Sequence, residues 1–179
     1  MNVHLTTTLQ FTLFHLQAED SINKTIEIMI TPHKISVEAL MTSLQNDKAG
    51  ASVLFAGIVR DVNKGKQVSR LEYEAFKPLA EKMIHNIEEE ARSTFNLIAA
   101  ICVHRVGKLN IGDTAVVVIT LAMHRQEAYE ANQFIIDKVK HEVPIWKKEY
   151  WADGTYAWGH NCNCQLPHKD LQEYLFHHK

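Results

Sequence analysis

Three apolar runs rich in β-branched residues constrain the fold of this chain most strongly. They are ASVLFAGIVR (51–60), LIAAICVHRVG (97–107) and TAVVVITLAM (114–123). Apolar runs of this length, in which polar residues do not alternate with apolar ones, are typical of strands that are buried in a sheet. The sequence therefore predicts a sheet whose main strands are shielded from solvent.

Helical patterns alternate with these runs. The first helix is expected over Ser36–Leu44 with Ser36 as N-cap, and the second begins near Pro78, because proline suits a first helical turn. A third amphipathic pattern covers 125–143 and ends at Pro144, which biases the residue before it away from helix. Two half-buried strands with alternating polar and apolar residues complete the series, at 25–30 and 68–76.

The resulting order is β-α-β-β-α-β-β-α-β, and it predicts an α+β fold with a largely antiparallel sheet and helices packed on it. The run 51–60 and the strand 68–76 flank a turn-forming loop, so we expect them to form a hairpin. A chain of 179 residues suits one domain, which we place at 25–160. Residues 1–24 are expected to be a poorly defined N-terminal extension, and residues 161–179 a C-terminal tail.

Composition excludes several classes of protein. With a net charge of −2, the chain lacks the excess of basic residues that is typical of a general nucleic-acid binder. An odd and sparse set of cysteines, Cys102, Cys162 and Cys164, argues against a disulfide framework and for a reducing compartment. No signal peptide is recognisable, and no run approaches the roughly eighteen apolar residues that cross a bilayer. We expect a soluble, cytoplasmic protein without a membrane partner.

Two basic positions are candidates for binding an anion. His124 and Arg125 fall where a buried strand meets a helix, and the N–H groups of a first helical turn favour phosphate or carboxylate. Arg60 ends another buried strand, where its fork-shaped side chain suits a planar anion. The alternatives are a helix cap and solvated surface arginines. A similar pair, His104 and Arg105, leads into no helix and is a weaker candidate.

The stretch VPIWKKEYW (143–151) places two lysines side by side in an expected strand. Consecutive strand residues point to opposite faces, so only one lysine can face a pocket. Lys147 shares its face with Glu149, whereas Lys148 lies on the other face. Lys140 lies near a helix C-terminus, where a cation is favourable for the helix dipole alone.

The tail contains His160, Cys162, Cys164 and His168, whose spacing is not a common structural-zinc pattern. We therefore predict no metal site. The chain also lacks the short motifs of nucleotide-fuelled enzymes, zinc proteases and serine hydrolases.

Several segments together resemble the large, catalytic subunit of molybdopterin synthase. They are FAGIVR (55–60), LEYEAFKPLAE (71–81), HRVG (104–107), MHRQEAYEA (123–131) and KHEVPIWKKE (140–149). The resemblance implies an α/β hammerhead-like fold and a sulfurtransferase of molybdenum cofactor biosynthesis. Such an enzyme moves sulfur from the thiocarboxylated C-terminus of a small ubiquitin-like subunit to cyclic pyranopterin monophosphate, which forms the dithiolene of molybdopterin. No cofactor is implied, because the activated sulfur arrives on the partner.

The resemblance assigns catalysis to Lys140 and Lys147. The substrate contacts that it implies are Ile58, Val59, Arg60, His124, Arg125, Lys140, Lys147, Lys148 and Glu149. If 125–143 is one helix, Arg125 and Lys140 are about 22 Å apart at 1.5 Å per residue. Either the helix is broken, or two subunits share each site. We predict the second arrangement, a homodimer within a heterotetramer.

Two other functions remain open. The same cations suit a binding module that holds an anionic small molecule or an extended peptide tail without catalysis. An RNA-contacting protein that uses Lys147, Lys148, Trp146 and Trp151 is disfavoured by the net charge.

Overall fold

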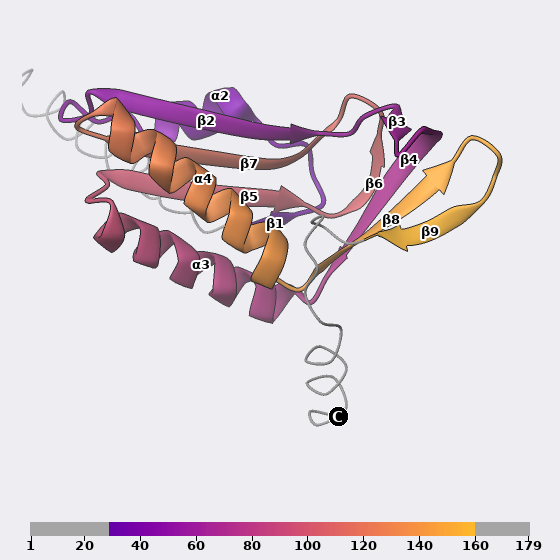
Figure 1. Cartoon of the computed structure of the whole chain (residues 1–179). Coiled ribbons are helices and arrows are strands. Elements are labelled where there is room, and N and C mark those ends of the chain that lie inside the picture. The colour runs from indigo at the N-terminus through magenta and orange to yellow at the C-terminus, as the bar shows by residue number, and fades with distance from the viewer. Residues whose placement is uncertain (1–28, 160–179) are drawn as a thin grey trace, which may run out of the picture.

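The computed structural model describes residues 29–159, and Figure 1 shows their arrangement as two sheets with three helices. In chain order the elements are β1 (Ile30–Thr31), α2 (Val37–Ser43), β2 (Ala51–Ile58), β3 (Val62–Asn63), β4 (Lys66–Ala75), α3 (Lys77–Thr94), β5 (Ala99–Arg105), β6 (Gly107–Asn110), β7 (Thr114–Ala122), α4 (Arg125–Glu142), β8 (Ile145–Trp151) and β9 (Tyr156–Gly159).

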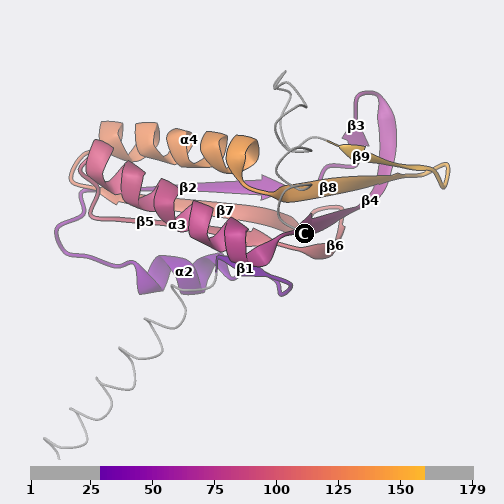
Figure 2. The ribbon, with the colours of Figure 1, turned by 90° about the horizontal axis from the view of Figure 1, so that it is seen from below.

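The first sheet has the strand order β1-β5-β7-β2, and only its β1–β5 pair is parallel. Helices α3 and α4 lie side by side on one face, and α2 covers the other face (Figure 2). Ser36 caps α2 as expected, because its hydroxyl accepts a hydrogen bond from the N–H of Ala39. The α+β fold with a largely antiparallel sheet is confirmed.

This layering explains why the central strands are apolar without alternation. Cys102 and Val118 pack towards α3 and α4, in a cluster that contains Ile84 and Ile135. On the opposite face, Ile101, Val117 and Ile119 pack in a second cluster. This cluster contains Leu40 of α2 and Leu44, which directly follows α2. Because both faces of β5 and β7 are buried, every position favours an apolar side chain.

The predicted hairpin between 51–60 and 68–76 is wrong. Strand β2 pairs along its length with β7, and β4 pairs with β8 and β6 in the second sheet. The local turn lies further on, at Lys64 (φ 50°) and Gly65 (φ 77°), and joins β4 to the two-residue strand β3. A two-residue hairpin turn with positive φ at both positions matches the twist of its strands. The tight turn therefore forms a smaller hairpin within the segment that was expected to be a loop.

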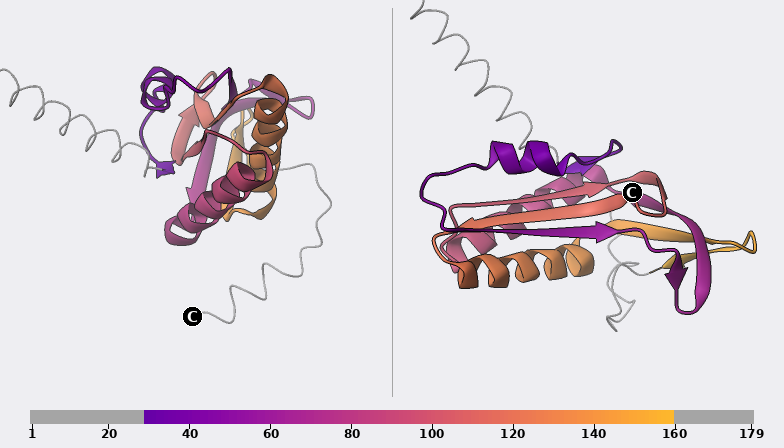
Figure 3. Two further views of the ribbon diagram at one scale, coloured as in Figure 1. Left: turned by 90° about the vertical axis from the view of Figure 1, so that its left-hand side faces the viewer. Right: turned by 90° about the horizontal axis from the view of Figure 1, so that it is seen from above.

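The second sheet has the order β3-β4-β8-β9, with β6 also paired to β4. It projects from the end of the first sheet at which α4 ends (Figures 1 and 3). Gly107, with φ of +85°, divides the predicted run 97–107 between β5 and β6. A separate apolar cluster supports this sheet and contains Val59, Val68, Leu71, Leu109 and Ala115.

Some expectations fall outside the described residues. These are most of the strand at 25–30, the extension at 1–24 and the tail with His160, Cys162, Cys164 and His168. Within 29–159, no helix is long and apolar enough to cross a membrane, and no cluster of side chains has the composition of a metal site. Cys102 is a buried residue of β5.

Candidate active site

Helix α4 separates the predicted site residues into two groups. It runs unbroken from Arg125 to Glu142, so the alternative of a broken helix is wrong. At 1.5 Å per residue, Arg125 and Lys140 are about 22 Å apart along its axis. The first group, His124 and Arg125, therefore lies at one end of the layered body. The second group, which contains Lys140, lies at the end from which the second sheet projects (Figure 1).

The centre of the second group is an ion pair on β8. Lys147 Nζ lies 2.7 Å from Glu149 Oε1, and the two side chains share one face of the strand, as predicted. Glu149 is only 5% exposed, and the Lys147 side chain is 19% exposed. Burial acts to raise the pKa of Glu149, but hydrogen bonds from Lys147 and Asn63 outweigh it and hold that pKa below its ordinary value.

A residue of the segment that was expected to be a loop joins this pair to the end of β2. Asn63 Nδ2 lies 2.8 Å from both carboxylate oxygens of Glu149. Arg60 Nη2 approaches Asn63 Oδ1 at 3.5 Å, a long hydrogen bond. Asparagine is common in turns, so the presence of Asn63 in this segment did not indicate a contact with Glu149. The pairing between strands brings Asn63 to Glu149, 86 positions along the chain.

Lys140 lies beside a buried histidine. Its side chain is exposed, with Nζ 5.4 Å from the centre of the Phe55 ring. His104 is 6% exposed, and its ring meets that of Tyr73 edge-on at 4.9 Å. Burial, with a further contribution from the charge of Lys140, lowers the pKa of His104 to about 4, although the hydrogen bond to the Arg105 carbonyl opposes the shift. The imidazole is therefore neutral at neutral pH.

Tyr73 connects the two predicted catalytic lysines. It lies opposite Lys147 in the β4–β8 register and contacts the ring of His104 near Lys140. Burial, with a contribution from the charge of Glu149, raises the pKa of Tyr73 to about 12. A neutral phenol and a neutral imidazole thus lie between the lysines. The weaker candidate of the sequence analysis, the 104–105 pair, contributes His104 to this group.

Lys148 points to the other face of β8. Its Nζ lies 4.0 Å from the ring centre of Tyr156, 5.1 Å from that of Tyr150 and 5.5 Å from that of Trp158. Three aromatic faces around one ammonium group make favourable cation–π contacts. The structure therefore does not bring Lys148 together with Lys147 and Glu149.

The residues before Arg60 differ in their surroundings. Ile58 is 58% exposed at the end of β2, whereas Val59 is 2% exposed and packs in the cluster with Leu71. The backbone N–H of Val59 donates to the carbonyl of Asp113, and its carbonyl accepts from the N–H of Gly112. Val59 thus anchors the chain where it leaves the first sheet, and it sets the direction in which Arg60 continues.

The first group lines an open depression of about 460 Å³ at the start of α4. Its walls are Gly50, Met123, His124, Arg125 and Gln126. His124 occupies the N-cap position, but its side chain makes no capping hydrogen bond to the helix. The first-turn N–H groups and Arg125 together favour an anion. Gly50 is required here, because a Cβ atom would lie 2.2 Å from the carbonyl oxygen of Met123.

Comparison with known proteins decides the family. The model of the MoaE protein family matches residues 30–142, which is more than half of the chain. The chain belongs to the MoaE family. The matched range contains Arg60, His124, Arg125 and Lys140, and it ends before the Lys147–Glu149 pair.

Individual proteins also resemble this MoaE family member in sequence and structure. The molybdopterin synthase catalytic subunit of Bacillus subtilis is 42% identical over 125 residues, which cover 70% of this chain and 80% of the relative. The crystal structure of molybdopterin synthase from Staphylococcus aureus has a TM-score of 0.70 and 38% identity, and the match covers 74% of this chain and 96% of that one.

A more distant structure shares the fold alone. It is described as a complex of subunits 1 and 2 of the molybdopterin-converting factor of Helicobacter pylori, with a TM-score of 0.61 and 20% identity. The match covers 74% of this chain and 90% of that one. The MoaE fold is therefore retained among proteins of low sequence similarity.

Proposed function

We propose that this chain is the catalytic subunit of a molybdopterin synthase. In this reaction, sulfur passes from the thiocarboxylated C-terminus of a small ubiquitin-like subunit to cyclic pyranopterin monophosphate, which forms the dithiolene of molybdopterin. We place the reaction in the cytoplasm and the catalytic unit at residues 25–160. Membership in the MoaE family and the B. subtilis relative support the reaction, and the sparse cysteines support the compartment.

The observation that carries the proposal is the gathering of Arg60, Lys140 and Lys147 at one end of a chain whose net charge is −2. The pterin brings a cyclic phosphate and the donor brings an anionic thiocarboxylate, so the site needs several fixed cations. Among residues 29–159, Arg60 and Lys140 have no carboxylate within ion-pair distance, which leaves their charge for an anion.

Lys147 differs from these cations, because Glu149 lies within hydrogen-bond distance of its ammonium group. The Lys147 amine becomes reactive when its ammonium group loses one proton to the substrate or to solvent, while the Glu149 carboxylate holds Nζ in place. Such an amine can act as a base or attack the carbonyl carbon of the donor. We assign proton transfer or nucleophilic attack to Lys147, and anion binding to Arg60 and Lys140.

The unbroken helix supports a homodimer with shared sites. One pterin monophosphate does not span about 22 Å along α4, so Lys140 and Lys147 of one subunit need His124 and Arg125 of the other. Each of the two sites then accepts the C-terminus of one small subunit, which gives a heterotetramer. Ile58 and Glu149 complete the proposed substrate contacts, whereas the buried Val59 directs Arg60 and Lys148 lies on the other face of β8.

Mixing two inactive variants tests the shared site. We expect Arg125→Ala and Lys140→Ala homodimers each to lose most activity, because each lacks one half of both sites. After subunit exchange, a mixed dimer retains one complete site, so about a quarter of wild-type activity should return in an equal mixture in which half of the dimers are mixed. Turnover is measured before and after exchange. An Arg125→Ala, Lys140→Ala double variant mixed with wild type is the control, because each shared site of a mixed dimer then lacks either Arg125 or Lys140, so that exchange should lower activity from about half to about a quarter of wild type. Failure of the single variants to complement while this control keeps its activity would contradict the shared site.

Reconstitution tests the function itself. The purified chain is incubated with cyclic pyranopterin monophosphate and a thiocarboxylated small subunit, and molybdopterin is measured after oxidation to a fluorescent derivative. We expect product that depends on both substrates. Absence of product under conditions in which the S. aureus enzyme is active would refute the proposed function.

A further inference from the structure

The β3–β4 hairpin places one side chain against the Lys147–Glu149 pair. Asn63 is the last residue of β3, directly before the turn at Lys64 and Gly65. Its Nδ2 donates to both oxygens of Glu149, at 2.8 Å each. Asn63 belongs to none of the segments that carry the family resemblance.

Charge fixes the orientation of the Asn63 amide. If the amide were turned over, Oδ1 would face a carboxylate, and two acceptors would repel each other. With Nδ2 directed at Glu149, Oδ1 is left for Arg60, whose Nη2 lies 3.5 Å away. One side chain therefore contacts the carboxylate of the ion pair and the exposed arginine.

Asn63 makes two of the three polar contacts that the Glu149 carboxylate has within residues 29–159. Oε1 accepts from Lys147 and Asn63, whereas the hydrogen bond to Oε2 found in the described part of the chain comes from Asn63. A buried carboxylate oxygen without a partner is costly. Without Asn63, we expect the Glu149 carboxylate to rotate towards other donors and the Lys147 ammonium group to move with it.

Lys147 is confined on its other side by β9. Gly159 lies opposite Lys147 in the β8–β9 register, and a Cβ atom at Gly159 would be only 3.1 Å from Lys147 Cε. The lysine stem thus runs close over a glycine, and its ammonium group is directed by Glu149. Small movements of Glu149 therefore change where the amine points.

We propose that Asn63 is a positioning residue for sulfur transfer: it fixes the Glu149 carboxylate, which in turn holds the Lys147 amine in its reactive position and keeps Arg60 beside it. This inference rests on the proposed function. It assigns Asn63 no contact with substrate, and it predicts an effect on turnover that exceeds any effect on binding.

The substitution Asn63→Leu tests this role, because leucine has a similar size and no hydrogen bonds. We expect kcat to fall about 10²-fold, as misplacement of a reacting group by about 1 Å can cause, with KM for the small subunit changed less than about threefold. The pKa of Glu149 should rise, measured by carbon-13 NMR of its carboxyl group. Lys147, Asn63, Lys64 and Tyr73 are the polar groups that act on this carboxyl, and only Asn63 is changed. Asn63→Gln, which keeps the amide, should recover part of kcat.

Gly65→Ala is the matched control. Gly65 has φ of +77° and no atom within 4 Å of an added Cβ, so alanine strains the turn without touching the site. It should lower the thermal midpoint but leave the pKa of Glu149 and kcat close to wild type. If Gly65→Ala reproduces the effects of Asn63→Leu, Asn63 acts only through the shape of the hairpin and the proposal is wrong. An unchanged Glu149 pKa and kcat in Asn63→Leu would also overturn it.

The NMR titration separates this proposal from the proposed function. It needs no turnover, so it reports on Asn63 and Glu149 even in a chain that forms no molybdopterin. If the wild-type chain forms no molybdopterin, the proposed function is refuted, and with it a role of Asn63 in sulfur transfer. Full wild-type activity together with an unshifted Glu149 pKa in Asn63→Leu refutes the positioning role alone.

Discussion

Replacing Lys147 with arginine is expected to lower turnover about 10²- to 10⁴-fold, the usual contribution of a positioned acid or base. Arginine keeps the positive charge beside Glu149, but it does not give up its proton in a protein and is a poor nucleophile. Affinity for the small subunit should remain within a fewfold of wild type. Single-turnover rates and calorimetric binding of the small subunit measure the two quantities separately.

Lys138→Arg is the matched control for this experiment. Lys138 also pairs with a carboxylate, with Nζ 2.7 Å from an oxygen of Glu90, but this pair joins α4 to α3 and lies outside both site groups. Its substitution should leave turnover unchanged. If Lys147→Arg also keeps its activity, charge alone suffices at this position, and a binding module becomes the better description of the chain.

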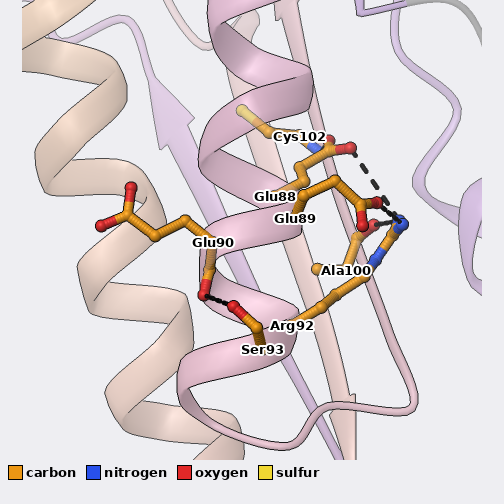
Figure 4. A network of polar contacts seen from close by, with 7 residues as sticks. All are labelled: Glu88, Glu89, Glu90, Arg92, Ser93, Ala100 and Cys102. Carbon is orange, nitrogen blue, oxygen red and sulfur yellow. Dashed lines mark hydrogen bonds and ion pairs between the residues drawn. The ribbon is translucent and has the colours of Figure 1, made fainter.

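A second large effect is expected on the pH dependence of stability, and it arises from a carboxyl group that belongs to neither site group. Glu88 of α3 accepts a hydrogen bond from the N–H of Cys102 at 2.6 Å, and Arg92 reaches both the Ala100 carbonyl and the Glu88 carboxylate (Figure 4). Burial raises the pKa of Glu88 to about 7, although the Cys102 hydrogen bond and the charge of Arg92 oppose the shift.

The sign of this effect follows from proton binding. The folded state holds the proton on Glu88 more tightly than the unfolded state does, so its contribution to stability is full below about pH 4.5. That contribution is lost as pH rises through about 7, and a shift of this size corresponds to about 3 kcal/mol. The difference in unfolding free energy between wild type and Glu88→Gln should therefore be larger at pH 4.5 than at pH 8, as measured by urea denaturation.

His104 provides the counterpart with the opposite sign. Its pKa is lowered from 6.5 to about 4, so the stability that it contributes is full above about pH 6.5 and is lost as pH falls through about 4. The difference between wild type and His104→Asn should grow with rising pH, by up to about 3 kcal/mol. In wild type the two effects largely cancel between pH 4.5 and 6.5. If the two differences changed with pH in the same direction, these assignments would be contradicted.

Local patterns predicted the elements of the first sheet and its helices well. The runs at 97–107 and 114–123 became β5–β6 and β7, and the helical periods became α2, α3 and α4 within a few residues of their expected ends. Strand pairing was predicted less well, because the residues of an apolar strand do not indicate which other strand it pairs with. The hairpin with 68–76 was expected from proximity in the chain, whereas β2 pairs with β7, which is far from it in the sequence, and forms an edge of the first sheet.

The candidate site shows the same division between local and long-range information. The period of two in a strand correctly placed Lys147 with Glu149 and separated Lys148 from them. The length of one helix correctly separated Arg125 from Lys140. No local signal indicated that Asn63 would meet Glu149, since a turn asparagine looks the same wherever its hairpin is placed.

The sequence by itself determined the family, through segments that match it along most of the chain. It also determined the α+β class and the faces on which the lysines lie, because these follow from residue types and periods along single segments. Only the tertiary structure decided that Tyr73 and His104 lie between the two lysines and that Asn63 holds Glu149. Such contacts join strands that are distant in the chain, and their register depends on how the sheets bury their apolar faces, which is a property of the whole fold.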